Sequence, residues 1–342
     1  MASATPWPLV STLVNRQVVL ASRPTVGAAL EHFRIEDIPM PSPGEGEVLL
    51  RTLYLSVDPY MLRVIKGITT YDPVNPGEAL VGRTICEVVG SRHPDYVPGD
   101  TVFLYARWQN YHVAPGGRLR KVDAHVMPPS AYLSVLGHSA LTAWAGLLDV
   151  GRPKAGETVV VSAAAGAVGS MVGQIARIQG CRAVGIAGGA AKCAHVVDTL
   201  GFEACVDYRS PTFAQDLRAA VPGGIDVYFE NVGGAVFDTV LALLNHSARV
   251  PLCGLVSHYS GEDAITFRHW GQMLTQLVRI QAFRVSDYLP RFDEAMADMA
   301  RWYGEGRIRY HESVAQGIEN APAAFVDMLT GRNVGKQLVR LS

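Results

Sequence analysis

Residues 159–169 read Val-Val-Val-Ser-Ala-Ala-Ala-Gly-Ala-Val-Gly, and a helix-like run over 170–179 follows at once. The β-branched residues favour a strand, and the small residues after it leave the first backbone N–H groups of the helix uncovered. The positive end of the helix dipole lies at the same point. Such a turn can hold the pyrophosphate of a dinucleotide, so the segment predicts the start of a Rossmann-type unit.

This turn lacks the full Gly-x-Gly-x-x-Gly pattern, because Ala164 occupies the place of the first glycine. The alternative interpretation is a tight strand–helix turn in which Gly166 and Gly169 only allow close packing of the backbone. The segments on either side of the turn favour the dinucleotide site.

From about residue 135 onward, short β-branched runs alternate with helix-like runs. This rhythm predicts a parallel sheet covered by helices on both faces and wound right-handed. We predict strands over 158–163, 182–187, 204–207, 225–229, 248–253 and 279–283. We predict helices over 167–179, 190–200, 213–220, 235–244 and 290–303.

The first 130 residues are rich in Pro and Gly and contain short β-like runs, for example 47–55, 85–89 and 101–105. This pattern is typical of an irregular β domain, often barrel-like. The last forty residues return to β character over 307–314 and 337–341, around a short helix over 321–329. We therefore predict an α/β protein of two domains, in which residues 1–134 and 304–342 form the β domain and residues 135–303 the Rossmann domain.

Composition excludes several classes of protein. The formal net charge of the 342 residues is −1 and basic residues form no runs, so we expect no nucleic-acid partner. No charge-free run of 18 apolar residues and no basic leader before an apolar core occur, so we expect neither a membrane span nor a secretory signal. The five cysteines are scattered without a Cys-x-x-Cys pair, which predicts reduced thiols, no disulfide framework, no local zinc site and a cytoplasmic location.

The residues after the second predicted strand indicate which dinucleotide binds. NAD-specific units carry an acidic residue at this place, whereas this chain has Gly188, Gly189 and then Lys192. Without the carboxylate a 2′-phosphate is not repelled, and Lys192 can attract it; Tyr208 and Arg209 follow the third strand and can line the same adenosine end. We predict NADPH as the cofactor, with an ordinary exposed lysine as the alternative interpretation of Lys192.

Seven segments together resemble one family in its order along the chain. They are LSVDPYM (55–61), AAAGAVGS (163–170), GQIA (173–176), GGAAKC (188–193), ENVGG (230–234), CGLVSHY (253–259) and GRNVGK (331–336). The chain resembles the zinc-independent medium-chain dehydrogenase/reductases, in the branch of prostaglandin and leukotriene reductases, alkenal double-bond reductases and bacterial curcumin reductase. The opening LASRP (20–24) resembles most the curcumin-reductase end of that branch.

The resemblance implies a GroES-like catalytic domain, a Rossmann domain, a cofactor cleft between them and a homodimer. It implies NADPH-dependent reduction of the C=C bond of an α,β-unsaturated ketone or aldehyde, with hydride to the β-carbon and a proton to the α-carbon. It also implies no metal, because Ser56-Val57-Asp58 and Val81-Gly82-Arg83 stand where zinc enzymes of the superfamily have a Cys and a Gly-His-Glu. An NADPH-dependent quinone or carbonyl reductase and a non-catalytic NADPH-binding protein are the alternatives.

By family position, Tyr259 is the first candidate for proton donation or carbonyl binding, and Tyr60 on the opposite wall is the second. His138 stands where relatives commonly have Met, and Leu62-Arg63-Val64 where they have Arg-Gly-Arg; His138 either faces the substrate or packs at a helix start. The predicted cofactor-binding residues are Ala165, Gly166, Ala167, Val168, Gly169, Gly188, Lys192, Tyr208, Asn231, Cys253, Gly254, Ser257, Tyr259, Phe283, Val285 and Asn333. For Asn231, Asn333 and Ser257, turn capping is the alternative role.

Overall fold

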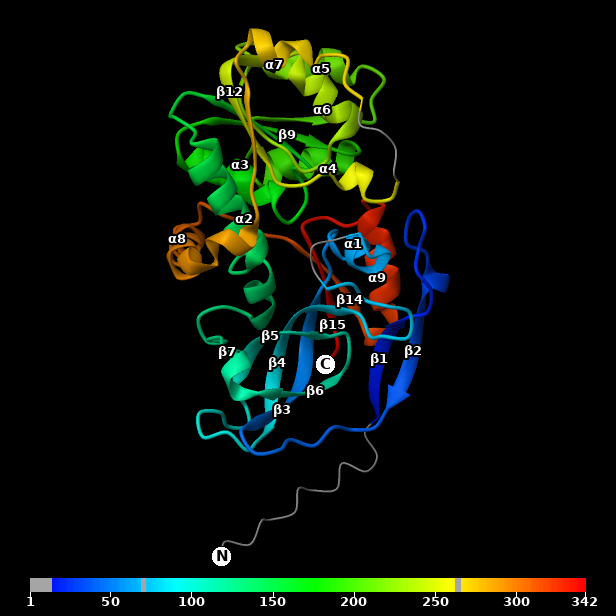
Figure 1. Ribbon diagram of the computed structural model, residues 1–342. Helices are drawn as coiled ribbons and strands as arrows, with labels where there is room; N and C mark the ends of the chain where they lie inside the picture. The colour runs from blue at the N-terminus through cyan, green and yellow to red at the C-terminus, as the bar shows by residue number, and fades with distance from the viewer. Residues whose placement is uncertain (1–13, 69–71, 262–265) are drawn as a thin grey trace, which may run out of the picture.

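The computed structural model describes residues 14–68, 72–261 and 266–342. The chain forms two bodies, an upper one built on a parallel sheet and a lower, β-rich one that contains both the first described strand and the C-terminus (Figure 1). The expectation that no secretory leader is present concerns residues outside the described part of the chain. Within the described part, no helix is long and apolar enough to cross a membrane.

The upper body contains a six-stranded parallel sheet in the order β10-β9-β8-β11-β12-β13. Its strands are β8 (Thr158–Ser162), β9 (Arg182–Ala187), β10 (Ala204–Asp207), β11 (Ile225–Phe229), β12 (Leu244–Leu252) and β13 (Arg279–Ala282). The order reverses beside β8, which is the point where open α/β sheets form a crevice beyond the carboxyl ends of their strands.

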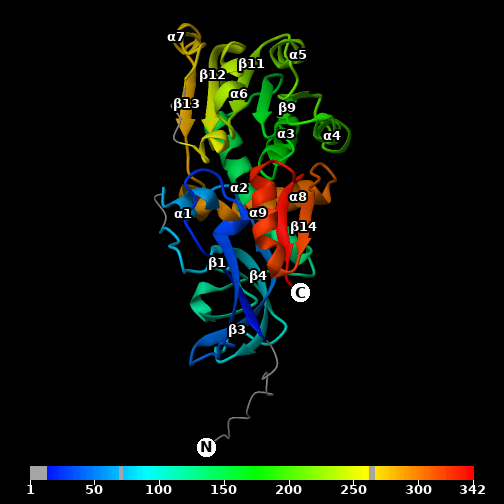
Figure 2. The same cartoon turned by 90° about the vertical axis from the view of Figure 1, so that its right-hand side faces the viewer.

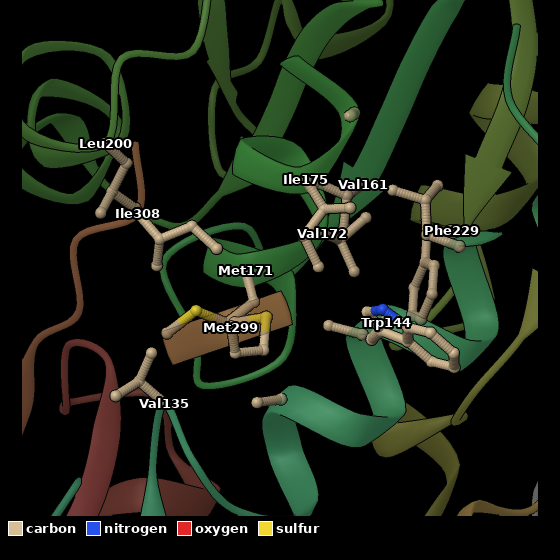
Figure 3. Packing of buried hydrophobic residues seen from close by; sticks show 14 of the residues in the cluster. Val135, Trp144, Val161, Met171, Val172, Ile175, Leu200, Phe229, Met299 and Ile308 are labelled. Carbon is tan, nitrogen blue, oxygen red and sulfur yellow. The ribbon is translucent and has the colours of Figure 1, made fainter. Parts of the chain in front are cut away.

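Helices cover both faces of this sheet. They are α2 (His138–Ala145), α3 (Gly169–Ile178), α4 (Ala190–Ala194), α5 (Phe213–Ala220), α6 (Gly234–Leu241), α7 (Gly271–Thr275) and α8 (Phe292–Gly304). Trp144 of α2, Met171 and Ile175 of α3 and Met299 of α8 pack with Val161 and Phe229 of the sheet (Figure 3). Strand β8 is buried along its whole length, as expected for a central parallel strand.

The lower body contains a seven-stranded sheet in the order β14-β15-β3-β4-β5-β7, with β6 paired to β3, and a separate β1–β2 pair. Its strands are β1 (Asn15–Leu20), β2 (Phe33–Ile38), β3 (Glu47–Ser56), β4 (Val81–Ser91), β5 (Thr101–Arg107), β6 (Tyr111–Pro115), β7 (Arg120–Lys121), β14 (Glu312–Gln316) and β15 (Lys336–Arg340). Strand β15 pairs antiparallel with β3, so the end of the chain completes the sheet begun near its start.

Two helices of the lower body, α1 (Met61–Lys66) and α9 (Ala321–Leu329), lie at its upper end, next to the parallel-sheet body (Figures 1 and 2). Their apolar side chains pack in one core with side chains of β1, β3 and β15. This core includes Leu62 and Ile65 of α1, Phe325 of α9 and Val339 of β15. Each such fully buried apolar side chain contributes about 1.5–3 kcal/mol to folding. The two helices are thereby fixed at the boundary between the bodies.

The predicted fold class is confirmed, and the differences concern the limits of elements. The strand predicted over 307–314 begins only at Glu312, because the side chain of Gln174 on α3 bonds both backbone groups of Arg309 and holds that segment against the upper body. The helix predicted over 190–200 is α4 followed by a π-helical turn over His195–Thr199. The helix predicted over 235–244 ends at Leu241, since Leu244 already pairs in β12.

Candidate functional site

A cleft of about 950 Å³ lies between the two bodies, at the carboxyl ends of the parallel strands. Every residue predicted for the site lines this one cleft: Tyr60, His138, Ala165, Gly166, Ala167, Val168, Gly169, Gly188, Lys192, Tyr208, Asn231, Cys253, Gly254, Ser257, Tyr259, Phe283, Val285 and Asn333. Its size is in the upper range for small-molecule and cofactor sites. The structure brings these residues together; their roles toward a ligand remain predictions.

The glycine turn lies between β8 and α3. A side chain at Gly169 would place its Cβ 2.4 Å from the carbonyl oxygen of Ala163, so the close approach of the backbone requires glycine there. No side chain caps the start of α3, which leaves the turn lined by backbone groups. The tail of the chain is fastened to the turn, because Gly335 N–H donates to Ala165 O over 2.7 Å. The turn therefore offers the cradle of N–H groups that a pyrophosphate fits.

The end of the cleft that is predicted to take the adenosine lies beyond β9. A Cβ at Gly188 would be 2.9 Å from the Tyr208 ring and 3.0 Å from Arg209 Nε, so these side chains close over the glycine. Lys192 Nζ donates to Gly331 O over 2.7 Å, and burial together with the charge of Arg209 lowers the pKa of Lys192. Two neighbouring cations with a lowered lysine pKa fit an anionic group such as a 2′-phosphate.

The opposite end of the cleft follows β11 and β12. Asn231 Nδ2 donates to Ser162 O over 2.8 Å, and Ser257 Oγ donates to Val232 O over 2.6 Å. Both side chains thus brace the loops, which agrees with the alternative role of turn capping. The Tyr259 hydroxyl lies close to Gly254. A Cβ atom added to Gly254 would be 3.2 Å from Tyr259 Oη. This places a phenol at the end of β12, facing the cleft.

Tyr60 lies on the facing wall, in the lower body, at the N-cap of α1. The Arg83 guanidinium stands 5.4 Å from the centre of its ring and 3.4 Å from its hydroxyl. Burial raises the pKa of Tyr60 well above its ordinary value, although Arg83 opposes the shift. At neutral pH the Tyr60 phenol is protonated, as a tyrosine of ordinary pKa also is, and it can donate a hydrogen bond.

A largely buried ionic cluster that the sequence did not predict lines the same cleft beside Tyr60. Lys336 Nζ is 2.6 Å from Asp58 Oδ1 and also donates to Val57 O over 2.8 Å; Arg83 is 3.5 Å from Asp58 Oδ2. Burial raises the pKa of Asp58, but the charges of Lys336 and Arg83 outweigh it and hold the pKa at about 2. Asp58 and Lys336 both occur in the quoted family segments, but nothing in the sequence indicates that they form a pair.

His138 lies at the start of α2 and lines the cleft from the upper body. Its ring is stacked on Phe103 with 5.8 Å between ring centres and lies at the same separation from Phe292. Its Nδ1 is buried and has no hydrogen-bond partner within the described residues. Burial, with a contribution from Arg83, lowers the pKa of His138 to about 3, so the ring is neutral at physiological pH.

We expect His138→Met to leave the pH profile of kcat unchanged between pH 5.5 and 9. The reason is that a group with a pKa of about 3 is deprotonated throughout this window and contributes no inflection there. The measurement is kcat for wild type and variant across the window, with KM recorded at each point. An inflection near pH 6–7 that is present in the wild type and absent from the variant would contradict a neutral ring.

The sequence matches two family descriptions. Residues 16–122 match the N-terminal domain of oxidoreductase, and residues 167–301 match the zinc-binding dehydrogenase family. The chain is 47% identical over 336 residues to the NADPH-dependent curcumin reductase of Escherichia coli, covering 96% of this chain and 97% of that protein. The chain belongs to the zinc-independent medium-chain dehydrogenase/reductase family.

Other members of the family support this assignment. The chain is 37% identical to prostaglandin reductase 1 of Rattus norvegicus, covering 90% of this chain and 94% of that protein. The crystal structure of CurA in complex with NADPH from Vibrio vulnificus superimposes with a TM-score of 0.91 at 44% identity, covering 96% of this chain and 99% of that one. Within the ranges described for this chain, no group of three or more His, Cys, Asp or Glu side chains could hold a metal ion.

Proposed function

We propose that this protein is an NADPH-dependent reductase of the C=C bond of α,β-unsaturated ketones or aldehydes. The observation that carries the proposal is one cleft that combines a glycine turn, two cations at its adenosine end and two tyrosines on facing walls. The high identity to an NADPH-dependent curcumin reductase supports both the cofactor and the class of acceptor.

The proposed cofactor residues divide along the cleft. The backbone of 165–169 takes the pyrophosphate, and Lys192 with Arg209 takes the 2′-phosphate, while Gly188 and Tyr208 line the adenosine. The remaining predicted residues also line the cleft, and Asn333 among them belongs to the C-terminal segment before β15. They are Asn231, Cys253, Gly254, Ser257, Phe283, Val285 and Asn333. When bound, NADPH supplies the hydride that adds to the β-carbon of the acceptor.

The protein's own contribution is the placement of hydrogen-bond donors. The Tyr259 hydroxyl donates to the carbonyl oxygen of the acceptor and stabilises the negative charge that develops there. The Tyr60 hydroxyl is the second donor; a phenol is protonated at neutral pH, and burial raises its pKa further. His138, being neutral, contacts the acceptor without adding charge. The α-carbon of the resulting enolate then takes a proton from solvent, so that one hydride and one proton give the saturated product.

The test is NADPH oxidation in the presence of an enone, an enal, a quinone and a simple ketone, with identification of the products. We expect a saturated ketone or aldehyde from the first two. An alcohol product would instead assign a carbonyl reductase, and selective turnover of the quinone a quinone reductase. NADPH binding without oxidation across the panel would assign a binding protein.

We expect Lys192→Ala to raise the KM for NADPH by about tenfold or more and the KM for NADH by less than about threefold, since only NADPH loses a charge-assisted contact. The measurement is KM for both cofactors at a saturating concentration of enone. Lys154→Ala, at an exposed lysine away from the cleft, is the control. Equal increases for the two cofactors would refute the assignment of Lys192 to the 2′-phosphate.

We also propose a cytoplasmic homodimer with the domain limits given by the sequence, 1–134 with 304–342 and 135–303. The five cysteines are free thiols, as is usual in a reducing compartment.

Strand β13 lies at one end of the parallel sheet, and Trp270, Leu274 and Leu277 beside it are exposed. Such an edge suits pairing with a second copy. Sedimentation equilibrium tests the dimer, and a monomer at micromolar concentration would refute it.

A further inference from the structure

Lys66 is a buried cation that connects the two bodies. It is the last residue of α1 in the lower body, and only 8% of its surface is exposed. Its Nζ donates to the backbone oxygen of Ser260 over 3.1 Å and lies 3.5 Å from that of Tyr259. These oxygens belong to the loop after β12, in the upper body. Lys66 therefore reaches across the boundary to the segment that carries the candidate catalytic tyrosine.

Among the described residues, the hydrogen-bond acceptors of Lys66 Nζ are the backbone oxygens of Tyr259 and Ser260. Within the described residues, no carboxylate lies within 4.0 Å of its Nζ. Burial of an ammonium group is unfavourable unless its hydrogen-bonding capacity is used. The two oxygens follow the 3-10 turn Val256–His258, and a backbone carbonyl oxygen is a strong hydrogen-bond acceptor. The contact is therefore attractive and directional, and it fixes the backbone at Tyr259.

A second cation on the same helix contacts the Tyr259 ring. Arg63 lies three residues before Lys66, so both occupy neighbouring positions on one face of α1. Its Cζ is 5.7 Å from the centre of the Tyr259 ring, within the range of a cation–π contact. Tyr60 forms the N-cap of the same helix. The helix α1 thus begins at Tyr60, and its side chains contact both the ring and the backbone of Tyr259.

We propose that Lys66 is a positioning residue, which fixes Tyr259 relative to Tyr60 by binding the backbone of residues 259 and 260 across the cleft. This inference rests on the proposed function, because it assigns Lys66 to the reaction only through Tyr259. A displacement of a donor by about 1 Å lowers a rate by up to about 100-fold. Loss of the Lys66 contact therefore affects turnover more than cofactor affinity.

The first test compares Lys66→Met, which keeps the length of the side chain, with Lys66→Arg, which keeps charge and donors. We expect Lys66→Met to lower kcat by about tenfold or more and to change the Kd for NADPH by less than about twofold. We expect Lys66→Arg to keep most of the wild-type kcat, because it keeps the charge and the donors. Lys154→Met, at an exposed lysine, is the control for loss of a lysine elsewhere. If Lys66→Met does not fold, Lys66→Gln serves the same comparison. Unchanged kcat in Lys66→Met or Lys66→Gln overturns the proposal.

The second test is a double-mutant cycle with Tyr259→Phe. If Lys66 acts through the Tyr259 hydroxyl, Lys66→Met lowers kcat in the wild-type background and has little further effect in the Tyr259→Phe background. An equal fall in both backgrounds overturns the positioning role and leaves the proposed function intact. Full activity of Tyr259→Phe alone is a different result, which removes the role of Tyr259 and with it the inference.

Discussion

Replacement of Tyr259 by Phe is expected to lower kcat by about 100-fold or more, because the removal of one preorganised donor to a developing oxyanion has an effect of this size. The substitution keeps the ring, so its packing and the cation–π contact with Arg63 are retained. The hydroxyl is the only group lost, and it lies at the end of β12 beside Gly254. Steady-state kinetics with an enone give kcat, and quenching of protein fluorescence gives the Kd for NADPH, which we expect to be unchanged.

Tyr303→Phe is the matched control, since Tyr303 is a partly exposed tyrosine on α8 away from the cleft lining. We expect its kcat to equal that of the wild type. If Tyr259→Phe also retains full turnover, the donor is not Tyr259, and Tyr60→Phe is the next variant to measure. A loss of NADPH affinity in Tyr259→Phe would instead assign the hydroxyl to cofactor binding.

Replacement of Lys336 by Met is expected to lower the free energy of unfolding by about 3–5 kcal/mol, since it removes the buried ammonium group that is the nearest counter-charge of the largely buried Asp58 carboxylate. The double variant Asp58→Asn with Lys336→Met removes both charges, so we expect it to recover much of the loss. Urea denaturation followed by circular dichroism measures both. Lys121→Met breaks the exposed pair with Asp100 and is expected to change the same free energy by less than about 1 kcal/mol.

The same cluster predicts a dependence of stability on pH. The pKa of Asp58 is about 2 in the folded chain, below the value of about 3.9 in an unfolded chain. Its contribution to stability is therefore present above about pH 4 and is lost as the pH falls from about 4 to about 2. Asp58→Asn is expected to flatten the stability curve in that window. A wild-type curve with the same slope as the variant would show that the Asp58–Lys336 pair does not stabilise the fold.

The sequence predicted the parallel sheet well, for a local reason. Strands such as 182–187 and 225–229 are short apolar runs between glycines and polar turns, and the structure places β9 and β11 at those residues. Where the limits were wrong, a distant contact decided them, as with Gln174 holding Arg309 out of the sheet. Local pattern cannot report a bond between residues 135 positions apart.

In the candidate site, too, local features could be predicted from the sequence, whereas contacts between distant segments could not. The glycine turn and the missing acidic residue after β9 were readable from residue type and spacing, because backbone conformation and charge sign are local properties. The resemblance supplied Tyr259 and Tyr60, and the structure places both along one cleft. The Asp58–Lys336 pair and the Lys66 contact join segments 278 and 193 to 194 residues apart, and neither was predicted.

By itself, then, the sequence of this protein determined the α/β rhythm, the glycine turn and the family, and it predicted NADPH as the cofactor. These follow from backbone preferences, from the hydrophobic period and from which charges are present or missing near one point of the chain. The tertiary structure alone decided which side chains face one another across the cleft and that α1 holds Tyr259. Those relations depend on how two independently patterned bodies meet. Burial there lowers the pKa of His138, and the charges of Lys336 and Arg83 lower the pKa of Asp58, in ways that no local spacing encodes.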